Sequence, residues 1–307
     1  MDLRLPELHA SILDTVRRFT SAELTPRAHA LEEGHEVDAA RGAFDALDLW
    51  GLTLPEERGG AGLDRLAYAL VVEALAAGSP SLAWTFALHA GPACAMLARS
   101  VHALDAVCAG RVASFVARES SLAPRAESFW VVEGLGTFAA DALSLRHVTT
   151  LGLRGAGLVQ IERPDQAETN EPTHAVAREW YELGAAATML GSAAAAIESA
   201  RTYALDRRQF GAPIASLQAI QFKLADALTE LDAVRLLVRR AAVAEQGAAS
   251  ARALAARAAT RATSEALQIH GGYGYTKEYA IERHVRAVRM LAQSDVARAE
   301  IAATSLA

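Results

Sequence analysis

Two rows of apolar residues, each repeating every seven positions, constrain the fold of this chain more than any other feature. The first row is Leu217, Leu224, Leu231 and Val238, and the second is Ile220, Ala227, Val234 and Ala241. Residues three, four and seven apart lie on one face of an α-helix, so this segment is predicted to be one long helix with a buried seam. A coiled coil has such a seam. Further long helical segments on both sides favour a four-helix bundle instead.

The segments that flank this helix complete the predicted bundle. Residues 185–205 and 252–269 are rich in alanine and contain no proline. Alanine loses no side-chain entropy in a helix, and its small side chain allows close packing. Glycines at 247 and 271–272 are predicted to end two of the helices, and a last helix is expected from Glu282 to the C-terminus. A C-terminal four-helix-bundle domain is therefore predicted for residues 176–307.

Helical spacing also dominates the first third of the chain. Leu8, Ile12, Val16 and Phe19 recur at this spacing. Residues 54–62 form a glycine-rich turn, and Asp64 is a good N-cap for a helix that follows it. The run Ser79-Pro80-Ser81 is predicted to separate that helix from another that ends near residue 100. Residues 1–110 are therefore predicted to form an N-terminal α-helical domain.

Between residues 111 and 175 the helical pattern gives way to strand-like composition. Residues 112–117 and 129–132 have the composition of short strands, and 149–161 carries glycines between apolar residues, which suggests turns between strands. Residues 164–172 are polar and are predicted to be a loop. These 65 residues can form only a small sheet. The predicted fold is mostly α, with a reduced β middle domain between two helical domains.

Composition limits the classes of function. The net charge of −6 argues against nucleic acid as the main partner, because phosphate binding needs a basic surface. The two cysteines, Cys94 and Cys108, lie in apolar helical sequence outside any Cys/His cluster, so we predict reduced thiols and no metal site. No run of roughly 18 apolar residues indicates a membrane span. The N-terminus has no signal-peptide pattern, so a cytoplasmic protein is expected.

Three stretches of sequence carry a family resemblance. They are residues 55–63 (PEERGGAGL), residues 206–214 (DRRQFGAPI, followed by Gln218 and by Leu224-Ala225-Asp226) and residues 268–276 (QIHGGYGYT). At this order and spacing the chain resembles the acyl-CoA dehydrogenase family over roughly residues 1–110 and 176–295. The resemblance implies that family's helical domains and an FAD-dependent oxidoreductase that performs α,β-dehydrogenation of an acyl thioester.

The same resemblance assigns cofactor-binding residues. It implies that FAD is contacted by Arg207, Gln209, Phe210, Gln218, Gln268, Gly271 and Gly272. Arginine offers a planar, always-charged group to a pyrophosphate, and glycine lets the backbone approach a ligand closely. In the family these contacts reach a neighbouring subunit's flavin, so a homo- or hetero-oligomer (dimer or tetramer) is implied. The implied partners are an acyl-CoA or acyl-carrier thioester and an electron-accepting flavoprotein.

The chain departs from the family pattern at two places. The middle domain is much shorter than the family's β-barrel. One flavin-ring motif survives at best faintly at residues 118–121, and the other is not found. The catalytic Glu-Gly-Thr run near the C-terminus is also missing. Counting without gaps places Asp295 at that position, where a carboxylate could still serve as base. Some family members carry the base on an earlier helix, where Glu182 lies one residue from the expected position, and Glu179 is a weaker candidate.

These departures leave a second hypothesis open. The chain is either an autonomous acyl-CoA dehydrogenase or a non-catalytic subunit that completes the FAD site of a related, complete chain. The loss of the ring-binding motifs together with the survival of the cross-interface residues favours the second hypothesis.

Overall fold

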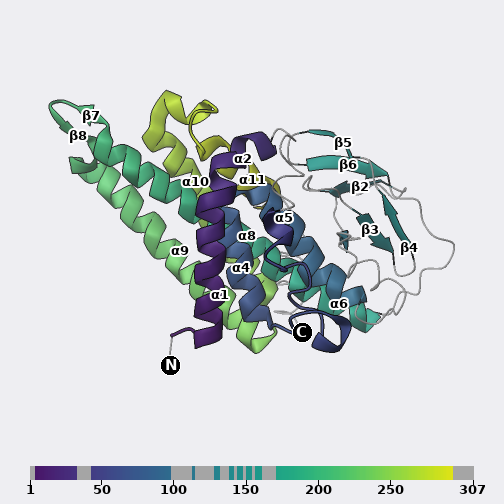
Figure 1. The fold of residues 1–307 in the computed structure, drawn as a ribbon. Helices are drawn as coiled ribbons and strands as arrows, with labels where there is room; N and C mark the ends of the chain where they lie inside the picture. Colours follow the sequence, from purple (N-terminus) through teal and green to yellow (C-terminus); the bar gives the residue numbers. More distant parts are fainter. Residues whose placement is uncertain are drawn as a thin grey trace, which may run out of the picture.

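The structure is a computed structural model that describes residues 4–32, 43–97 and 171–292, together with short strands between residues 113 and 160. Helices form most of the described chain; strands β2–β6 (residues 128–160) lie at one side of the helical body, and β7 and β8 (residues 208–213) lie at the opposite end (Figure 1). The predicted domain boundaries at 110/111 and 175/176 remain predictions.

The N-terminal region is a layer of helices. Its elements are α1 (Glu7–Phe19), the π-helix η1 (Thr20–Leu24), α2 (Thr25–Glu32), the 3-10 turn η2 (Glu56–Arg58), α4 (Arg65–Gly78), α5 (Pro80–Leu88), the π-helix η3 (His89–Ala93) and α6 (Cys94–Leu97). The buried face of α1 consists of Leu13, Val16 and Phe19. Leu8, in the first turn of α1, is 57% exposed.

The predicted beginnings of α4 and α5 are confirmed, whereas the predicted helix end near residue 100 lies outside the described residues. The side chain of Asp64 accepts a hydrogen bond of 2.9 Å from the backbone N–H of Ala67, which caps α4. Ser79 caps α5 in the same way through Leu82, and Pro80 occupies the first helical position, where its missing N–H costs nothing. These two caps place α4 and α5 side by side against the rest of the protein.

Among the described residues, six strands lie between the helical regions. They are β1 (Ala113–Ser114), β2 (Ser128–Val131), β3 (Phe138–Asp141), β4 (Ser144–His147), β5 (Thr150–Leu153) and β6 (Ala156–Gln160). One sheet has the order β1-β3-β4 and the other has the order β2-β6-β5. Strands β5 and β6 form an antiparallel hairpin in which Gly152 pairs with Gly157, so these two glycines are strand residues rather than turn residues. The sequence did not predict β3 or β4.

Four long helices form the C-terminal bundle. They are α8 (Glu171–Asp206), α9 (Gln218–Ala244), α10 (Ala248–His270) and α11 (Ile281–Ala292). A hairpin of β7 (Arg208–Gln209) and β8 (Ala212–Pro213) and the 3-10 turn η4 (Ile214–Ser216) join α8 to α9, while the 3-10 turn η5 (Gly271–Tyr275) follows α10. Helix α8 contacts all three other bundle helices and also packs against α4 and α5. The predicted bundle is therefore confirmed, and α8 is shared between the two helical regions.

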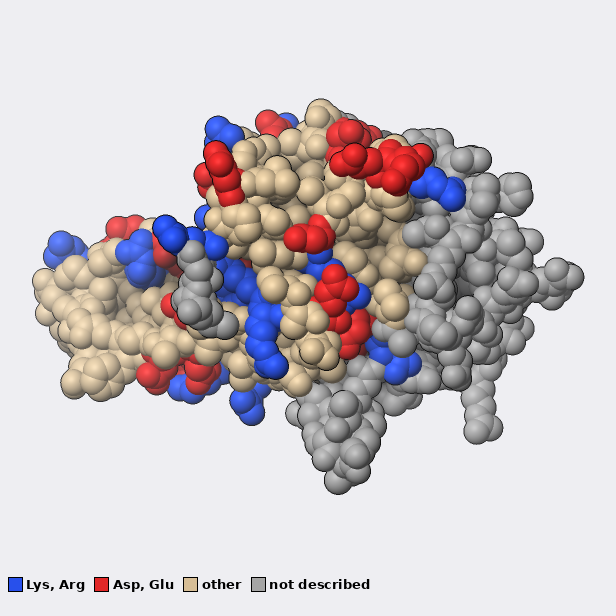
Figure 2. All heavy atoms as spheres, turned by 90° about the horizontal axis from the view of Figure 1, so that it is seen from below, with Lys and Arg blue, Asp and Glu red and all other residues tan. Residues whose placement is uncertain are grey.

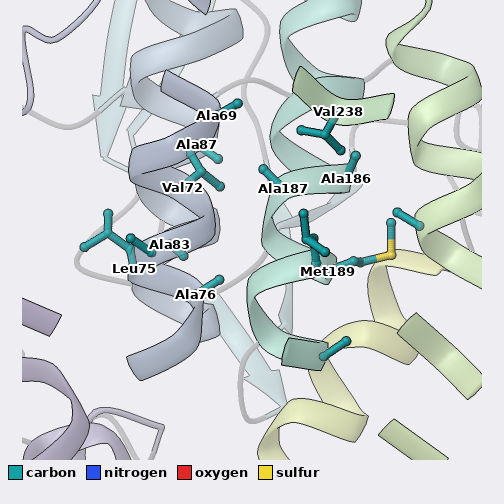
Figure 3. Close-up of a cluster of buried hydrophobic side chains, with 14 of the residues drawn as sticks. Ala69, Val72, Leu75, Ala76, Ala83, Ala87, Ala186, Ala187, Met189 and Val238 are labelled. Carbon is teal, nitrogen blue, oxygen red and sulfur yellow. The ribbon is translucent and has the colours of Figure 1, made fainter. Parts of the chain in front are cut away.

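Alanine makes the close packing around α8 possible. Ala69, Ala76, Ala83 and Ala87 belong to one buried cluster with Ala187, whose side chain points from α8 toward α4, whereas Ala186 lies on the side of α8 nearer Val238 (Figure 3). At Gly191 a Cβ would lie 2.0 Å from the backbone oxygen of Glu73, so only glycine allows α8 to pass α4 at this distance.

The predicted seam of α9 is confirmed for only part of its length. Ala227, Leu231, Val234, Val238 and Ala241 are buried, but Leu217 is 45% exposed, and Ile220 and Leu224 are half-buried. The first turns of α9 extend beyond the helical body together with the β7–β8 hairpin (Figure 1). The beginning of the seam is therefore more open to solvent than the rest.

Helix α8 is long and apolar enough to cross a membrane by length and composition alone. In the described part of the chain it is the one helix that passes this test, and 78% of its most apolar stretch is buried inside the protein. Burial of that kind is typical of the central helix of a packed core. The face seen in Figure 2 carries both acidic and basic side chains, with a run of basic ones near its middle.

Candidate functional site

The β7–β8 hairpin carries two of the predicted cofactor-binding residues, Gln209 and Phe210. Gln209 pairs with Ala212, and the two turn residues between them, Phe210 and Gly211, have φ of 54° and 81°. Two positive φ values are the mark of a type I′ turn, which suits glycine at the second position but is unfavourable for phenylalanine at the first. Phe210 is 95% exposed. The hairpin therefore presents a strained, solvent-facing aromatic ring beyond the end of the bundle.

The second predicted stretch forms a tight turn at the end of α10. Gly271 ends the helix with φ 59° and ψ −138°, a conformation that only glycine adopts readily. No atom lies within 4 Å of the position that a Cβ would take at Gly271 or at Gly272. Gln268 is exposed on the last turn of α10. The backbone of this turn is therefore accessible to a ligand from solvent.

The structure brings Arg207 and this turn together. The Arg207 guanidinium lies 5.9 Å from the ring centroid of Tyr273. Both residues line a cavity of about 630 Å³ between the end of α8 and the end of α10. Tyr203, His270 and Tyr279 form its aromatic wall: Tyr203 stacks on His270 at 4.5 Å, and Tyr279 meets both rings edge-on. Gln218 begins α9 and is exposed, outside the lining of this cavity.

The charges around the cavity leave one free cation. Glu198 makes a bidentate pair with Arg201 at 2.6 and 2.9 Å, and this hydrogen bonding lowers the pKa of Glu198. Burial lowers the pKa of His270, although its hydrogen bond to the Ala266 carbonyl opposes that effect. Among the described residues Arg207 has no ion pair. The cavity thus offers the Arg207 guanidinium, which has no ion pair in the described chain, beside the Asp206 carboxylate, an imidazole of lowered pKa and aromatic faces. The guanidinium and the aromatic faces suit a phosphorylated aromatic ligand.

The candidate base Glu182 lies in a different place. Glu182 and Arg252 form an ion pair of 2.8 Å in which the two side chains are 1% and 2% exposed. Arg252 also donates to the backbone oxygen of Leu291 at 3.2 Å and lies 5.1 Å from the ring centroid of Tyr181. Burial alone would lower the pKa of Arg252, but Tyr181 and Glu182 outweigh it and raise that pKa. At about 1.5 Å per helical residue, Glu182 and Arg207 are about 38 Å apart along α8.

The other two candidate bases are Glu179 and Asp295. Glu179 accepts a hydrogen bond of 3.2 Å from the backbone N–H of Ala248, so it satisfies the first turn of α10. Asp295 lies outside the described residues, and its role as base stays a prediction.

Three features of this region were not predicted from the sequence. They are the ion pair of Arg252, the aromatic wall of the cavity, and a buried contact of 2.8 Å between Ser192 and His284. One signal was available for the first. Arg252 lies on the buried alanine face of α10 together with Ala248, Ala255 and Ala259. A charged residue on such a face needs a buried partner.

Comparison with known proteins agrees with this architecture. The family model described as "Acyl-CoA dehydrogenase, N-terminal domain" matches residues 6–102, and "Acyl-CoA dehydrogenase, C-terminal domain" matches residues 181–303. The short-chain specific acyl-CoA dehydrogenase of Bos taurus mitochondria is 31% identical over an alignment that covers 94% of this chain and 86% of that protein. The chain belongs to the acyl-CoA dehydrogenase family. FAD is the cofactor of this family.

Further comparisons refine this picture of an acyl-CoA dehydrogenase family member. A 3-(aryl)acrylate reductase of Clostridium sporogenes is 50% identical over 117 residues, which cover 36% of this chain and 31% of that protein. The solved structure of butyryl-CoA dehydrogenase from Megasphaera elsdenii has a TM-score of 0.80 at 22% identity and covers all of both chains, so it shows the same fold. The alignment with the bovine protein runs over 358 positions against 307 residues here. At least 51 of its positions therefore have no counterpart in this chain, in accord with a reduced middle domain.

Proposed function

We propose that this protein is an FAD-dependent acyl-CoA dehydrogenase that oxidises the α,β-bond of an acyl thioester. One observation carries the proposal: Arg207, with no ion pair among the described residues, shares a cavity with His270 and Tyr273, the residues on either side of Gly271 and Gly272. A diphosphate needs both a cation and accessible backbone N–H groups. The open space at the two glycines and the unpaired guanidinium fit such a group.

Each residue of this half-site has a distinct task in the proposed reaction. Arg207 holds negative charge, the lack of side chains at Gly271 and Gly272 lets a ligand approach the backbone closely, and the hairpin residues Gln209 and Phe210 extend from the bundle toward a neighbouring subunit. FAD, when bound, accepts the hydride that leaves the β-carbon of the thioester. The positions of these residues at an exposed end of the bundle support an oligomer in which one chain completes the site of another.

The proton at the α-carbon requires a carboxylate base from this chain. We assign that role to Asp295 in preference to Glu182. A base must be able to accept a proton near neutral pH, and the Glu182 carboxylate is held by the Arg252 cation in a buried pair. Opposite charge at this distance favours the ionised carboxylate and makes it a weaker base.

The test is direct. The purified full-length chain is examined for the visible absorbance of an oxidised flavin and for its bleaching on addition of acyl-CoA thioesters of increasing chain length. Bleaching together with formation of the enoyl product supports the proposal. A chain that binds no FAD after reconstitution, alone or with a co-expressed family member, overturns it.

A reducing direction is the second candidate function. It is favoured by the 50% identity over 117 residues with the 3-(aryl)acrylate reductase. The same preparation, reduced with dithionite and mixed with an arylacrylate and its thioester, distinguishes the two directions. Faster flavin reoxidation by the arylacryl compound than by an aliphatic enoyl thioester identifies the reductive reaction.

A further inference from the structure

A second cavity, of about 290 Å³, shares no lining residue with the Arg207 site. It forms where the end of α1 and the π-helix η1 meet α4, α8 and α9. Part of its wall is apolar and small, with Ala77 from α4 and Ala194 from α8. A cavity of this size is at the lower end of the range for small-molecule sites. It can therefore hold a ligand of only several non-hydrogen atoms.

The π-helix places a polar group in this wall. Thr20, the first residue of η1, lines the cavity and is only 5% exposed. Its hydroxyl has no hydrogen-bond partner among the described residues. Buried side-chain hydroxyls nearly always have a partner, and π-helical turns occur often at functional sites. The Thr20 hydroxyl therefore indicates a polar ligand.

The charged side chains around this cavity indicate which charge a ligand would carry. Arg17 lies three residues before Thr20, so both side chains occupy the same side of the helix. Arg17 is exposed and has no ion pair or hydrogen bond within the described chain. Arg235, on the α9 wall, is already neutralised: its Nε donates to Glu73 at 2.9 Å and one Nη donates to Asp232 at 2.5 Å. Arg17 is therefore the charged side chain of this cavity wall that has no ion-pair partner among the described residues, which suits a ligand with one negative charge.

We propose that this cavity binds a small carboxylate with a short apolar chain. The carboxylate accepts hydrogen bonds from the Arg17 guanidinium and the Thr20 hydroxyl, and the chain lies against the methyl groups of Ala77 and Ala194. A larger acid does not fit the volume. A neutral ligand leaves Arg17 without a counter-charge.

Sodium butanoate is the probe, titrated into the full-length protein by calorimetry at constant ionic strength. We expect saturable binding that weakens at least tenfold in Arg17→Gln and several-fold in Thr20→Val. Arg18→Gln is the matched control, because Arg18 is the neighbouring exposed arginine and does not line this cavity. It should leave the affinity unchanged. Butanamide, which has the same shape without the charge, should bind much more weakly.

Several results would overturn the proposal. They are absence of saturable butanoate binding in the parent, equal affinity in Arg17→Gln, and equal loss in Arg17→Gln and Arg18→Gln. Inorganic phosphate that binds through Arg17 more tightly than butanoate would exclude the carboxylate. Arg17 is exposed, so Arg17→Gln is expected to fold, and its affinity for butanoate can be measured. Thr20→Val should also raise the melting temperature of the ligand-free protein, because an unsatisfied buried hydroxyl is removed.

Discussion

Replacing Arg252 by methionine removes the cation from a pair whose two side chains are almost completely buried. Methionine retains much of the aliphatic volume, so the loss is mainly electrostatic. Breaking a buried ion pair from one side costs about 3–5 kcal/mol, because the remaining charge has no counter-ion. The lost hydrogen bond to Leu291 adds about 1 kcal/mol. The two effects overlap, and we expect a loss of about 4–5 kcal/mol in the free energy of unfolding.

The pH dependence separates the charge effect from a loss of packing. In Arg252→Met the Glu182 carboxylate can take up a proton from solvent, which removes the buried charge, so the destabilisation should shrink between pH 8 and pH 5. In Glu182→Gln the Arg252 cation stays charged at every pH, so the destabilisation should stay constant. The double variant Glu182→Leu/Arg252→Met leaves no buried charge and should come within about 2 kcal/mol of the parent.

Urea unfolding at 25 °C, followed by circular dichroism at both pH values, measures these differences. At roughly 2 °C per kcal/mol, the melting temperature of Arg252→Met should fall by about 10 °C. The control is Arg261→Met in the same helix, whose ion pairs with Glu230 and Asp226 are exposed and should contribute less than about 1 kcal/mol. A loss below about 1 kcal/mol in Arg252→Met, or a loss that is equal at the two pH values, would refute this account.

Three further predictions concern the proposed reaction and the buried histidine. Arg207→Ala should reduce the flavin content of the purified protein strongly, because a charge-assisted contact to a diphosphate is lost; unchanged absorbance contradicts the assignment. Asp295→Asn should abolish turnover while FAD content stays the same, whereas an active variant transfers the role of base to another carboxylate. Burial and the nearby Arg283 charge lower the pKa of His284 to about 3, from 6.5. The unfolded chain thus binds the proton more readily, and stability is fully present above pH 6.5 and lost as pH falls toward 3. Between pH 7.5 and pH 5 the loss should be about 2 kcal/mol, and His284→Gln should abolish that part of the slope in urea unfolding.

Local signals in the sequence predicted most of the helical architecture. Asp64 and Ser79 act through backbone groups three residues away, and Gly271 acts through its own φ, so each boundary could be inferred from a few neighbouring residues. The β3 and β4 strands were missed because Phe138-Ala-Ala-Asp and Ser144-Leu-Arg-His lack the β-branched alternation that marks a strand.

The candidate site was predicted where it depends on recognisable motifs and missed where it depends on distant partners. Arg207 and the glycine turn were found from the family resemblance, and the structure places them at one cavity. Arg252 was missed because its partner, Glu182, is 70 residues away in the sequence. Only the packing of α8 against α10 makes them neighbours. The exposed first turns of α9 were missed for the same reason, since a heptad pattern does not show where the opposite helix ends.

The turn at Phe210 sets a limit on how this protein can be stabilised. A non-glycine residue with positive φ costs about 1–2 kcal/mol, and an almost fully exposed phenylalanine ring recovers little by burial. Asparagine or glycine would relieve the strain at this position. Laboratory selection for heat resistance alone would therefore favour loss of Phe210. Selection that also demands turnover would retain it, if the ring contributes to cofactor binding in a neighbouring chain. Sequences selected for heat resistance alone should therefore differ at this residue from sequences selected for both heat resistance and turnover. Position 210 is thus a site where stability and activity conflict.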